Sequence, residues 1–364
     1  MAHSQAAMNR RQFLTSAACA GAAAALSNLP LVAAEKAPNS AHLPLWRGFN
    51  LLEKFTFREG GNPAFQEDDF RRMTDWGFNF ARLPMSYRCW VGTDWLQFRE
   101  EDLKHIDQAV AFGRRHRVHV NINFHRAPGY CVNPPKEPLD LWTDEKALDV
   151  CSQHWGVFAK RYKGISNSEV SFDLLNEPPD IKEESYVRVA TRLVQAIRSE
   201  DPNRLVIADG LRWGREPVHG LVELGVAQST RGYEPMQISH YKANWVNGSD
   251  TWPEPTWPLR PGQKDEVNKQ TLKEKGILPW KKLEAKGVGV HVGEWGTFNR
   301  TPHKVTLAWM RDCLDLWREA GWGWALWNLR GSFGVMDSDR ADVDYETVQG
   351  HKLDREMLKV LQAG

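Results

Sequence analysis

The strongest constraint on the fold of this chain is an alternation that repeats eight times from Trp46 onward. Short apolar runs, rich in β-branched or aromatic residues, alternate with longer segments that carry their apolar residues on one helical face. Buried parallel strands joined by amphipathic helices have this pattern. The expected strands are 46–51, 78–83, 118–124, 170–175, 204–208, 236–240, 288–293 and 322–327. The expected helices are 66–76, 102–116, 144–163, 183–200, 215–224, 268–286, 303–320 and 352–362.

Eight such units predict an α/β fold, a single (β/α)₈ TIM barrel over residues 35–364. An open doubly wound sheet is the alternative. It usually carries a phosphate-binding loop after an early strand, and the chain has neither G-x-G-x-x-G nor G-x-x-x-x-G-K. Gly77, Gly287 and Gly321 each separate a predicted helix from the next strand, where a left-handed helix cap is expected. The Trp-bearing segment 241–267 is predicted to be a loop on the sixth unit.

The N-terminal segment has the pattern of an export signal. The paired Arg10 and Arg11 precede an alanine-rich stretch that reaches Leu26, and small residues follow at 32–34. This order predicts a twin-arginine-type signal over residues 1–34 that is removed near Ala34. A retained membrane anchor is the alternative, but the alanine-rich stretch is only weakly hydrophobic. We therefore expect a periplasmic or extracellular protein.

Composition excludes some classes of partner. The formal net charge is +1 and no basic run is present, whereas nucleic acid binding needs a basic face. We expect no nucleic acid partner, no membrane partner beyond the signal, and a monomer. The chain has 17 Trp against 7 Tyr and 15 Phe. Indole rings suit stacking on sugar rings, although any single tryptophan could equally lie in the core.

The cysteines do not indicate a metal or a cofactor. Outside the predicted signal lie Cys89, Cys131, Cys151 and Cys313, without a Cys-x-x-Cys motif or a His/Cys cluster. An exported protein can form disulfides, but the spacing specifies no pairing. We predict neither a metal nor a cofactor.

Polar and aromatic residues follow the predicted strands repeatedly at one end. In a (β/α)₈ barrel the catalytic groups lie at the C-terminal ends of the strands. Scattered surface polarity would not select that end again and again. The candidate residues are Arg82, His125, Asn176, Glu177, His240, Tyr241, Glu294 and Trp327.

Two of these residues are carboxylates, Glu177 after the fourth strand and Glu294 after the seventh. Glycoside hydrolysis needs one carboxylic acid to protonate the leaving oxygen and a second carboxylate near the anomeric carbon. A separation of about 5 Å would indicate retention of configuration and about 9 Å inversion. Each glutamate could alternatively make a surface salt bridge. We expect Arg82 to pair with the catalytic carboxylate and keep it ionised.

The ordered set Arg82, His125, Asn176-Glu177-Pro178, Glu294 and Trp327 resembles glycoside hydrolase family 5, the cellulase family of the retaining barrel clan A. The resemblance covers about 46–330. It implies double displacement with Glu177 as acid/base and Glu294 as nucleophile. It also implies a sugar platform at Trp327 and supporting contacts from Arg82, His125 and Asn176.

One departure from this family lies after the sixth predicted strand. The family normally shows His-x-Tyr there, with the tyrosine bonded to the nucleophile, and this chain reads Ser239-His240-Tyr241-Lys242. We expect Tyr241 to take the tyrosine role and His240 to point into the cleft. In the other register, Lys242 would stand where the tyrosine belongs.

Family membership does not fix the substrate, because the same fold and mechanism serve many sugars. We expect a β-glucan. The runs 47–50 and 125–129 resemble the branch with exo-acting β-1,3-glucanases, but cellulases also begin with a similar first run. We place β-1,4 linkage ahead of β-1,3, and mannan next, with endo or exo action open. Loss of a catalytic carboxylate would favour the alternative of a non-catalytic carbohydrate-binding barrel, and both carboxylates are present. A metal-dependent hydrolase would need histidines with the spacing of a known zinc motif, and His125 and His240 do not have that spacing.

Overall fold

A computed structural model describes residues 37–364, so the predicted export signal lies outside the described residues. The described chain forms a closed barrel of eight parallel strands, as predicted. The first strand pairs with the second and with the last, and the second pairs with the third. Its strands are β1 (Arg47–Asn50), β2 (Phe80–Ser86), β3 (His119–Ala127), β5 (Val170–Asp173), β6 (Val206–Asp209), β7 (Ala227–Gly232), β8 (Val290–Trp295) and β9 (Trp324–Leu326).

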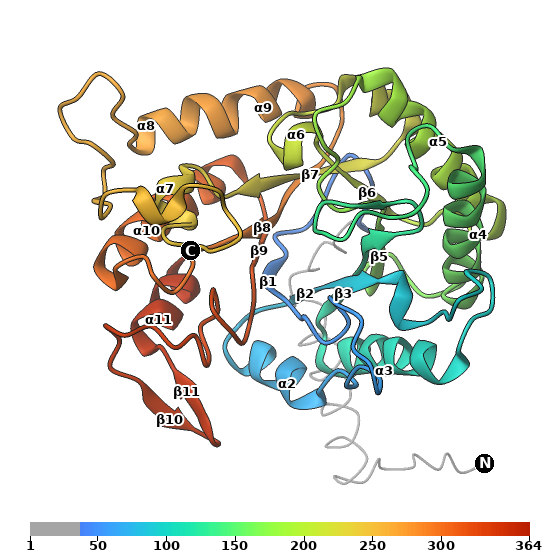
Figure 1. Ribbon diagram of the computed structural model, residues 1–364, viewed down its shortest axis with the longest axis horizontal. Helices are drawn as coiled ribbons and strands as arrows, with labels where there is room; N and C mark the ends of the chain where they lie inside the picture. Colours follow the sequence, from blue (N-terminus) through green and yellow to red (C-terminus); the bar gives the residue numbers. More distant parts are fainter. Residues whose placement is uncertain (1–36) are drawn as a thin grey trace, which may run out of the picture. The chain divides into compact units, whose positions relative to one another are not determined.

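Helices surround these strands (Figure 1). Most lie where the sequence predicts them: α2 (Glu67–Asp75), α3 (Glu100–His116), α4 (Glu145–Arg161), α5 (Glu183–Glu200), α10 (His303–Ala320) and α11 (Arg355–Ala363). The predicted helix 268–286 is divided into α8 (Lys269–Leu272), the π-helical turn η4 (Lys273–Ile277) and α9 (Leu278–Glu284). The predicted helix 215–224 shrinks to a 3₁₀ turn, η2 (His219–Leu224).

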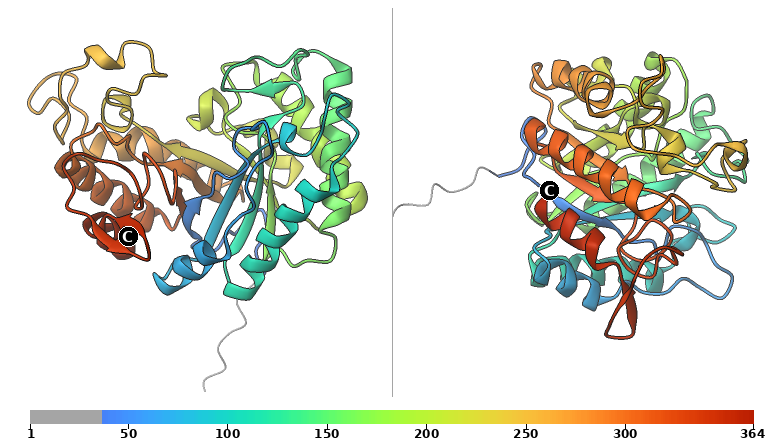
Figure 2. Two further views of the ribbon diagram at one scale, coloured as in Figure 1. Left: turned by 60° about the horizontal axis from the view of Figure 1, so that its bottom comes forward. Right: turned by 90° about the vertical axis from the view of Figure 1, so that its left-hand side faces the viewer.

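Several short elements decorate the barrel. They are η1 (Tyr87–Cys89), β4 (Tyr130–Cys131), α6 (Leu211–Gly214), α7 (Met236–Ser239), η3 (Ser249–Thr251), and the strands β10 (Glu346–Val348) and β11 (His351–Leu353). β4 pairs with the end of β3 in antiparallel orientation, and β10 and β11 form a hairpin. Figure 2 shows this hairpin beside α11.

The prediction for the sixth barrel strand is wrong. The strand is β7, and the predicted run 236–240 falls on the short helix α7. β7 reads Ala-Gln-Ser-Thr-Arg-Gly, and its side chains from Gln228 to Arg231 are buried within the protein. This strand carries almost no apolar signal, because both of its faces are polar. Arg231 bonds to Ser229 and to the site carboxylates, whereas Gln228 and Thr230 bond to the backbone of Val218 and Gly214.

Local sequence signals explain where several helices begin and end. Asp144 caps α4 by accepting hydrogen bonds from the backbone N–H groups of Lys146 and Ala147. Gly77, Gly287 and Gly321 adopt φ angles of 85°, 83° and 77°. These values lie in the left-handed region that the predicted caps require.

The N-terminal end of the barrel is filled by a packed layer that supports the other end. The Trp46 ring stacks on His119 with centroids 3.7 Å apart, and Phe80 packs against both. Burial lowers the pKa of His119 to about 3, so this imidazole is neutral. The cysteines within residues 37–364 are all free thiols. No helix in the same range is both long and apolar enough to span a bilayer.

Candidate active site

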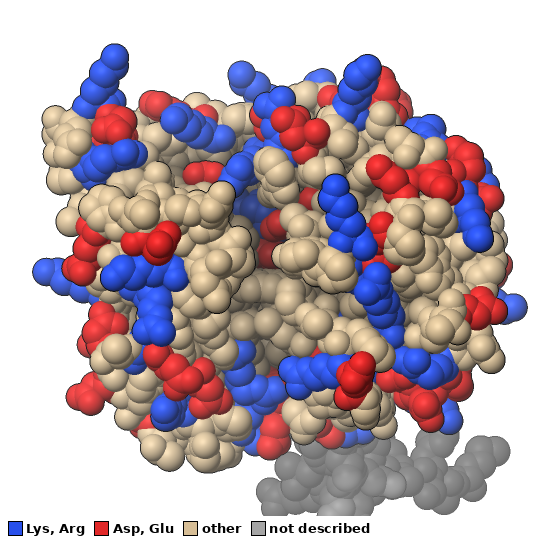
Figure 3. Space-filling model, viewed as in Figure 1, with Lys and Arg blue, Asp and Glu red and all other residues tan. Residues whose placement is uncertain are grey.

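A cleft of about 1370 Å³ opens at the C-terminal ends of the strands. Five of the predicted site residues line it: His125, Glu177, His240, Glu294 and Trp327. Figure 3 shows the hollow near the middle of this face, with acidic atoms visible in its depth. Arg82 and Asn176 are buried beneath its surface, each 1% exposed.

Glu294, at the end of β8, is held by two arginines and a tyrosine. Arg82 Nη1 donates to its Oε1 at 2.5 Å, and Arg231 Nη2 lies 3.3 Å from the same oxygen. Tyr233 Oη donates to Oε2 at 3.2 Å. Two buried guanidinium groups therefore contact one oxygen of this carboxylate. Oε2 carries a single hydrogen bond and keeps a lone pair for other contacts.

Arg82 ties Glu294 to the barrel interior. Its Nε donates to Asp173 at 2.8 Å, and its Nη1 donates to Asn50 Oδ1 at 3.1 Å. Because this guanidinium bonds to several strands at once, its position is fixed by the barrel itself. The predicted ion pair between Arg82 and a strand-end glutamate is present, and the partner is Glu294.

Glu177 is held at three points. Its backbone N–H donates to Asp209 Oδ2 at 2.9 Å, and its carbonyl oxygen accepts from Tyr130 Oη at 2.5 Å. Arg231 Nε donates to its carboxylate at 3.1 Å. Its φ angle is 51°, an uncommon conformation for a residue with a side chain and one often found at functional sites.

The two glutamates differ in their electrostatic environment. Burial raises the pKa of Glu177, and the charge of Glu294 raises it further, against the lowering effect of Arg231. Glu294 contacts two guanidinium groups, whereas Glu177 contacts one. The arrangement therefore favours the protonated form of Glu177 and surrounds Glu294 with more positive charge than Glu177 has.

Asn176 and His125 lie next to each other beside the two glutamates. Asn176 Oδ1 accepts from Arg82 Nη2 at 3.0 Å and from Arg231 Nη2 at 2.9 Å, which fixes the orientation of its amide. Its Nδ2 therefore faces His125 Nε2, 3.5 Å away. Burial and the nearby arginines hold the pKa of His125 well below its ordinary value, so the imidazole is neutral.

Aromatic rings line both sides of the cleft. Trp327 lies nearly parallel to His125, with centroids 5.5 Å apart. Phe57, Trp213 and Trp245 are 42%, 38% and 55% exposed, and all three line the cleft. Large exposed rings gathered in one cleft indicate a ligand with flat apolar faces.

The prediction for Tyr241 is wrong. The tyrosine that contacts Glu294 is Tyr233, in the run Arg231-Gly232-Tyr233 that ends β7. Tyr241 is buried outside the cleft lining, and Lys242 Nζ lies 5.0 Å from the centroid of its ring. His240 does line the cleft; its Nδ1 lies 2.8 Å from Ser239 Oγ, and burial lowers its pKa to about 4.

Sequence reasoning also missed Arg231, Asp209 and Tyr130. Arg231 Nη1 donates to Asp209 Oδ1 at 3.0 Å, and Nη2 bonds to the other oxygen, Oδ2. The usable signal was Arg-x-Tyr, which has the spacing of the family's His-x-Tyr. It was overlooked because the sixth strand was placed nine residues too late at its start, at 236 instead of 227.

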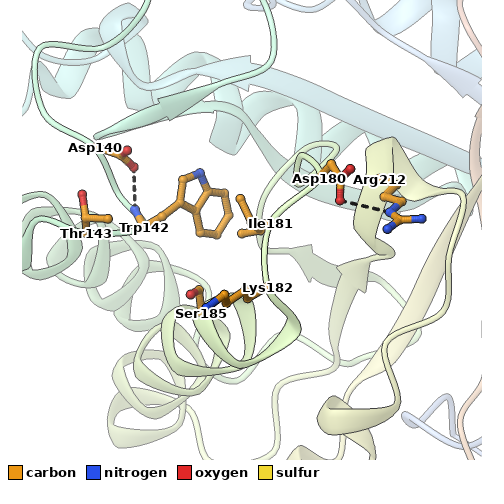
Figure 4. A pocket seen from close by; sticks show the side chains of 8 residues that line it. All are labelled: Asp140, Trp142, Thr143, Asp180, Ile181, Lys182, Ser185 and Arg212. Atoms are coloured by element: carbon orange, nitrogen blue, oxygen red, sulfur yellow. Dashed lines mark hydrogen bonds and ion pairs between the residues drawn. The ribbon is translucent and has the colours of Figure 1, made fainter.

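A second, shallower pocket of about 650 Å³ lies between the loops that precede α4 and α5. Figure 4 shows the Trp142 ring in its middle beside Ile181, with the ion pair of Asp180 and Arg212 at one side. This pocket contains none of the predicted site residues. Within residues 37–364, no group of three or more His, Cys, Asp or Glu side chains is placed to hold a metal ion.

Fold and site together define a barrel enzyme of the glycoside hydrolase class. Residues 39–332 match the family described as Cellulase (glycosyl hydrolase family 5), and the chain belongs to that family. It is 24% identical over 311 residues to Endoglucanase C of Acetivibrio thermocellus, covering 78% of this chain and 89% of that protein.

Solved structures agree with this assignment. A glycoside hydrolase of 39% sequence identity superposes with a TM-score of 0.83, covering 87% of this chain and 98% of the other. Endoglucanase Cel5A of Thermotoga maritima superposes with a TM-score of 0.71 at 21% identity, covering 89% and 98%, and shows the shared fold.

Proposed function

We propose that this glycoside hydrolase cleaves a β-glucan with retention of configuration, with Glu177 as acid/base and Glu294 as nucleophile. The observation that carries the proposal is a pair of carboxylates, one after β5 and one at the end of β8, both bonded to the single guanidinium of Arg231. One carboxyl has a raised pKa and the other is doubly paired with arginine. Acid and nucleophile need this difference.

In the first step, Glu294 Oε2 attacks the anomeric carbon while Glu177 gives its proton to the leaving glycosidic oxygen. The bond from the anomeric carbon to that oxygen breaks, and an ester between Glu294 and the sugar forms. We expect the Asn176 amide, whose oxygen is held by two arginines, to support a sugar hydroxyl. Trp327 supplies a flat face for the same sugar ring.

In the second step, water attacks the anomeric carbon and gives a proton to the Glu177 carboxylate, while the bond from that carbon to Glu294 breaks. Formation of the ester removes the charge of Glu294, which is one of the causes that raise the pKa of Glu177. The ionised form of Glu177, which is the form that can accept a proton, is therefore favoured when a base is needed. Departure of the sugar returns the charge to Glu294 and the proton to Glu177.

Among β-glucans, we propose β-1,4-linked chains as the preferred substrate. The relatives covering most of the chain include an endoglucanase and, at 22% identity over 70% of this chain, Cellodextrinase A of Ruminococcus flavefaciens. A Probable glucan 1,3-beta-glucosidase A of Emericella nidulans matches 33% of it. β-1,3-glucan and mannan are the alternatives within the family.

The experiment is product release by residues 35–364 from a panel of cellulose derivatives, β-1,3-glucan, mixed-linkage glucan, xylan and mannan. Glu294→Gln serves as the blank. We expect release from a β-1,4-glucan that is absent from the blank, and product length separates endo from exo action. Release from mannan or β-1,3-glucan alone would contradict the substrate. Equal release by the blank would contradict the role of Glu294.

We also propose that residues 1–34 are a cleaved twin-arginine-type export signal and that the mature protein is a monomer outside the cytoplasm. Arg10→Lys with Arg11→Lys should keep the protein in the cytoplasm with its N-terminus intact. N-terminal sequencing of the exported protein and light scattering test the cleavage site and the monomer.

A further inference from the structure

The position where the family normally has a histidine is occupied here by Arg231. It stands two residues before Tyr233, which bonds to Glu294 as the family's tyrosine does. A histidine can be neutral, and a guanidinium remains charged at all working pH values. This chain has therefore placed a permanent positive charge between the two glutamates.

That charge has a dedicated partner in Asp209, at the end of the preceding strand β6. Asp209 bonds to both terminal nitrogens of Arg231, and both side chains are at least 98% buried. Because the charges of Arg231 and Asp209 cancel, the pair adds no net charge to the site. A neutral histidine would add none either. The two residues therefore act as one buried unit at the position where the family normally has a histidine.

Both members of the pair also hold Glu177. Asp209 Oδ2 accepts from its backbone N–H, and Arg231 Nε donates to its carboxylate. Ser229 Oγ, 3.0 Å from Arg231 Nη1, and Asn176 Oδ1 bind the remaining edges of the guanidinium. The plane of the guanidinium is thus fixed. The direction of the hydrogen bond from Arg231 Nε to the Glu177 carboxylate is fixed with it.

We propose that the Arg231–Asp209 ion pair is a positioning unit that holds Glu177 and sets the pH range over which it acts as an acid. The inference rests on the proposed role of Glu177. Neutralising Asp209 leaves Arg231 uncompensated and favours the charged form of Glu177. Neutralising Arg231 leaves Asp209 uncompensated and favours the protonated form.

Other ionisable groups around the pair are held in one state. Arg82 stays charged, and burial lowers the pKa values of His125 and His291, so both are neutral. Burial raises the pKa values of Tyr130, Tyr186 and Tyr233, which stay protonated. At the cleft mouth Arg215 and Glu234 form an ion pair of their own at 2.9 Å.

Asp173 is the buried carboxylate that can confuse the measurement, because burial and the charge of Asp209 raise its pKa to about 7. Its side chain bonds to Arg82 and not to Glu177. Asp173→Asn is therefore the matched control, since it neutralises an equally buried aspartate without touching the acid/base.

The experiment measures kcat/KM against pH for Asp209→Asn, Arg231→Gln, the double variant and Asp173→Asn, on the glucan that the panel identifies. We expect Asp209→Asn to move the basic limb down by about 1 pH unit and Arg231→Gln to move it up by a similar amount. The double variant should return the limb to within about 0.3 units of wild type. Asp173→Asn should move it less than Asp209→Asn.

Falling rates with an unmoved basic limb would overturn the inference, since a purely structural pair lowers activity without changing that limb. Circular dichroism melting identifies variants that fail to fold, and Arg231→Lys, which keeps the charge, then replaces Arg231→Gln and should leave the limb in place. Glu177→Gln separates the two proposals. If it keeps the basic limb and the activity, the role of Glu177 itself is wrong.

Discussion

Tyr130 Oη donates a 2.5 Å hydrogen bond to the backbone carbonyl oxygen of Glu177. The tyrosine comes from β4, the short strand that folds back on the end of β3, and its partner lies after β5. This contact fixes the peptide after Glu177 at a residue whose φ angle is 51°. The hairpin therefore helps to hold the acid/base in an unfavourable backbone conformation.

Tyr130→Phe should consequently lower kcat about tenfold, since the carbonyl loses its partner and the Glu177 carboxyl is less well placed. The lost hydrogen bond should also cost about 1 kcal/mol of unfolding free energy. Tyr162→Phe is the matched control, because its hydroxyl bonds to Asp107 of α3 and neither residue lines the cleft. The control should lose stability and keep kcat; equal kinetic losses in both variants would count against the positioning role.

Because the pKa of Glu177 is raised in the folded state, the free energy of unfolding should depend on pH. The folded state favours the protonated carboxyl, so the contribution of Glu177 is present below the unfolded-state pKa and is lost as pH rises through the folded-state pKa. Glu177→Gln cannot lose a proton. At pH 9 it should melt about 2 °C above wild type, and near pH 4 the difference should vanish. Calorimetry across this range checks the sign, and a lower melting temperature for the variant at pH 9 would refute it.

The nucleophile can be tested by chemical rescue. Glu294→Ala should lose at least about 10⁴-fold in kcat, because the attacking carboxylate is gone. Azide should restore part of the activity on an activated aryl glycoside and give a glycosyl azide of inverted anomeric configuration. NMR of the product decides the matter: a retained configuration would be incompatible with Glu294 as nucleophile.

Much of this architecture could be predicted from the sequence, for a physical reason. Strands 118–124 and 170–175 carry buried apolar residues at every second position, so their pattern was visible. Glu177 follows the second of them closely, and Glu294 directly follows the predicted strand 288–293. β7 was hidden because the residues that alternate with Ser229 and Arg231, Gln228 and Thr230, are also polar and bond to the backbone of neighbouring loops. Arg231 and Tyr233 were therefore read as part of a loop. Asp209 lies one residue beyond the predicted strand 204–208, and nothing in the local pattern indicated that Tyr130 reaches the Glu177 carbonyl.

The corrected position of the sixth strand assigns the contact with Glu294 to Tyr233 instead of Tyr241, and this assignment can be tested. Tyr233→Phe should lower kcat about tenfold, since Glu294 Oε2 loses its hydrogen bond and the charge on that oxygen is no longer oriented. Tyr241→Phe should leave kcat within about twofold of wild type, because Tyr241 lies outside the cleft lining. Steady-state kinetics of the two variants test this assignment. The reverse order of effects would restore Tyr241 to the site.

The exposed aromatic rim predicts how longer substrates bind. Trp245 is 55% exposed, yet its ring is held edge-on against Phe298 at 4.8 Å, so it offers a fixed flat face to a sugar beyond the cleavage point. Trp245→Ala should raise KM for a long oligosaccharide about fivefold, with kcat on a short activated glycoside unchanged, since stacking contributes about 1 kcal/mol. Leu278→Ala is the control, because this 46% exposed side chain begins α9 and does not line the cleft. If KM for the long substrate rises equally in both variants, or in neither, the ring is not a sugar platform. A rise confined to Trp245→Ala that grows with chain length would place the bound glucan along this wall.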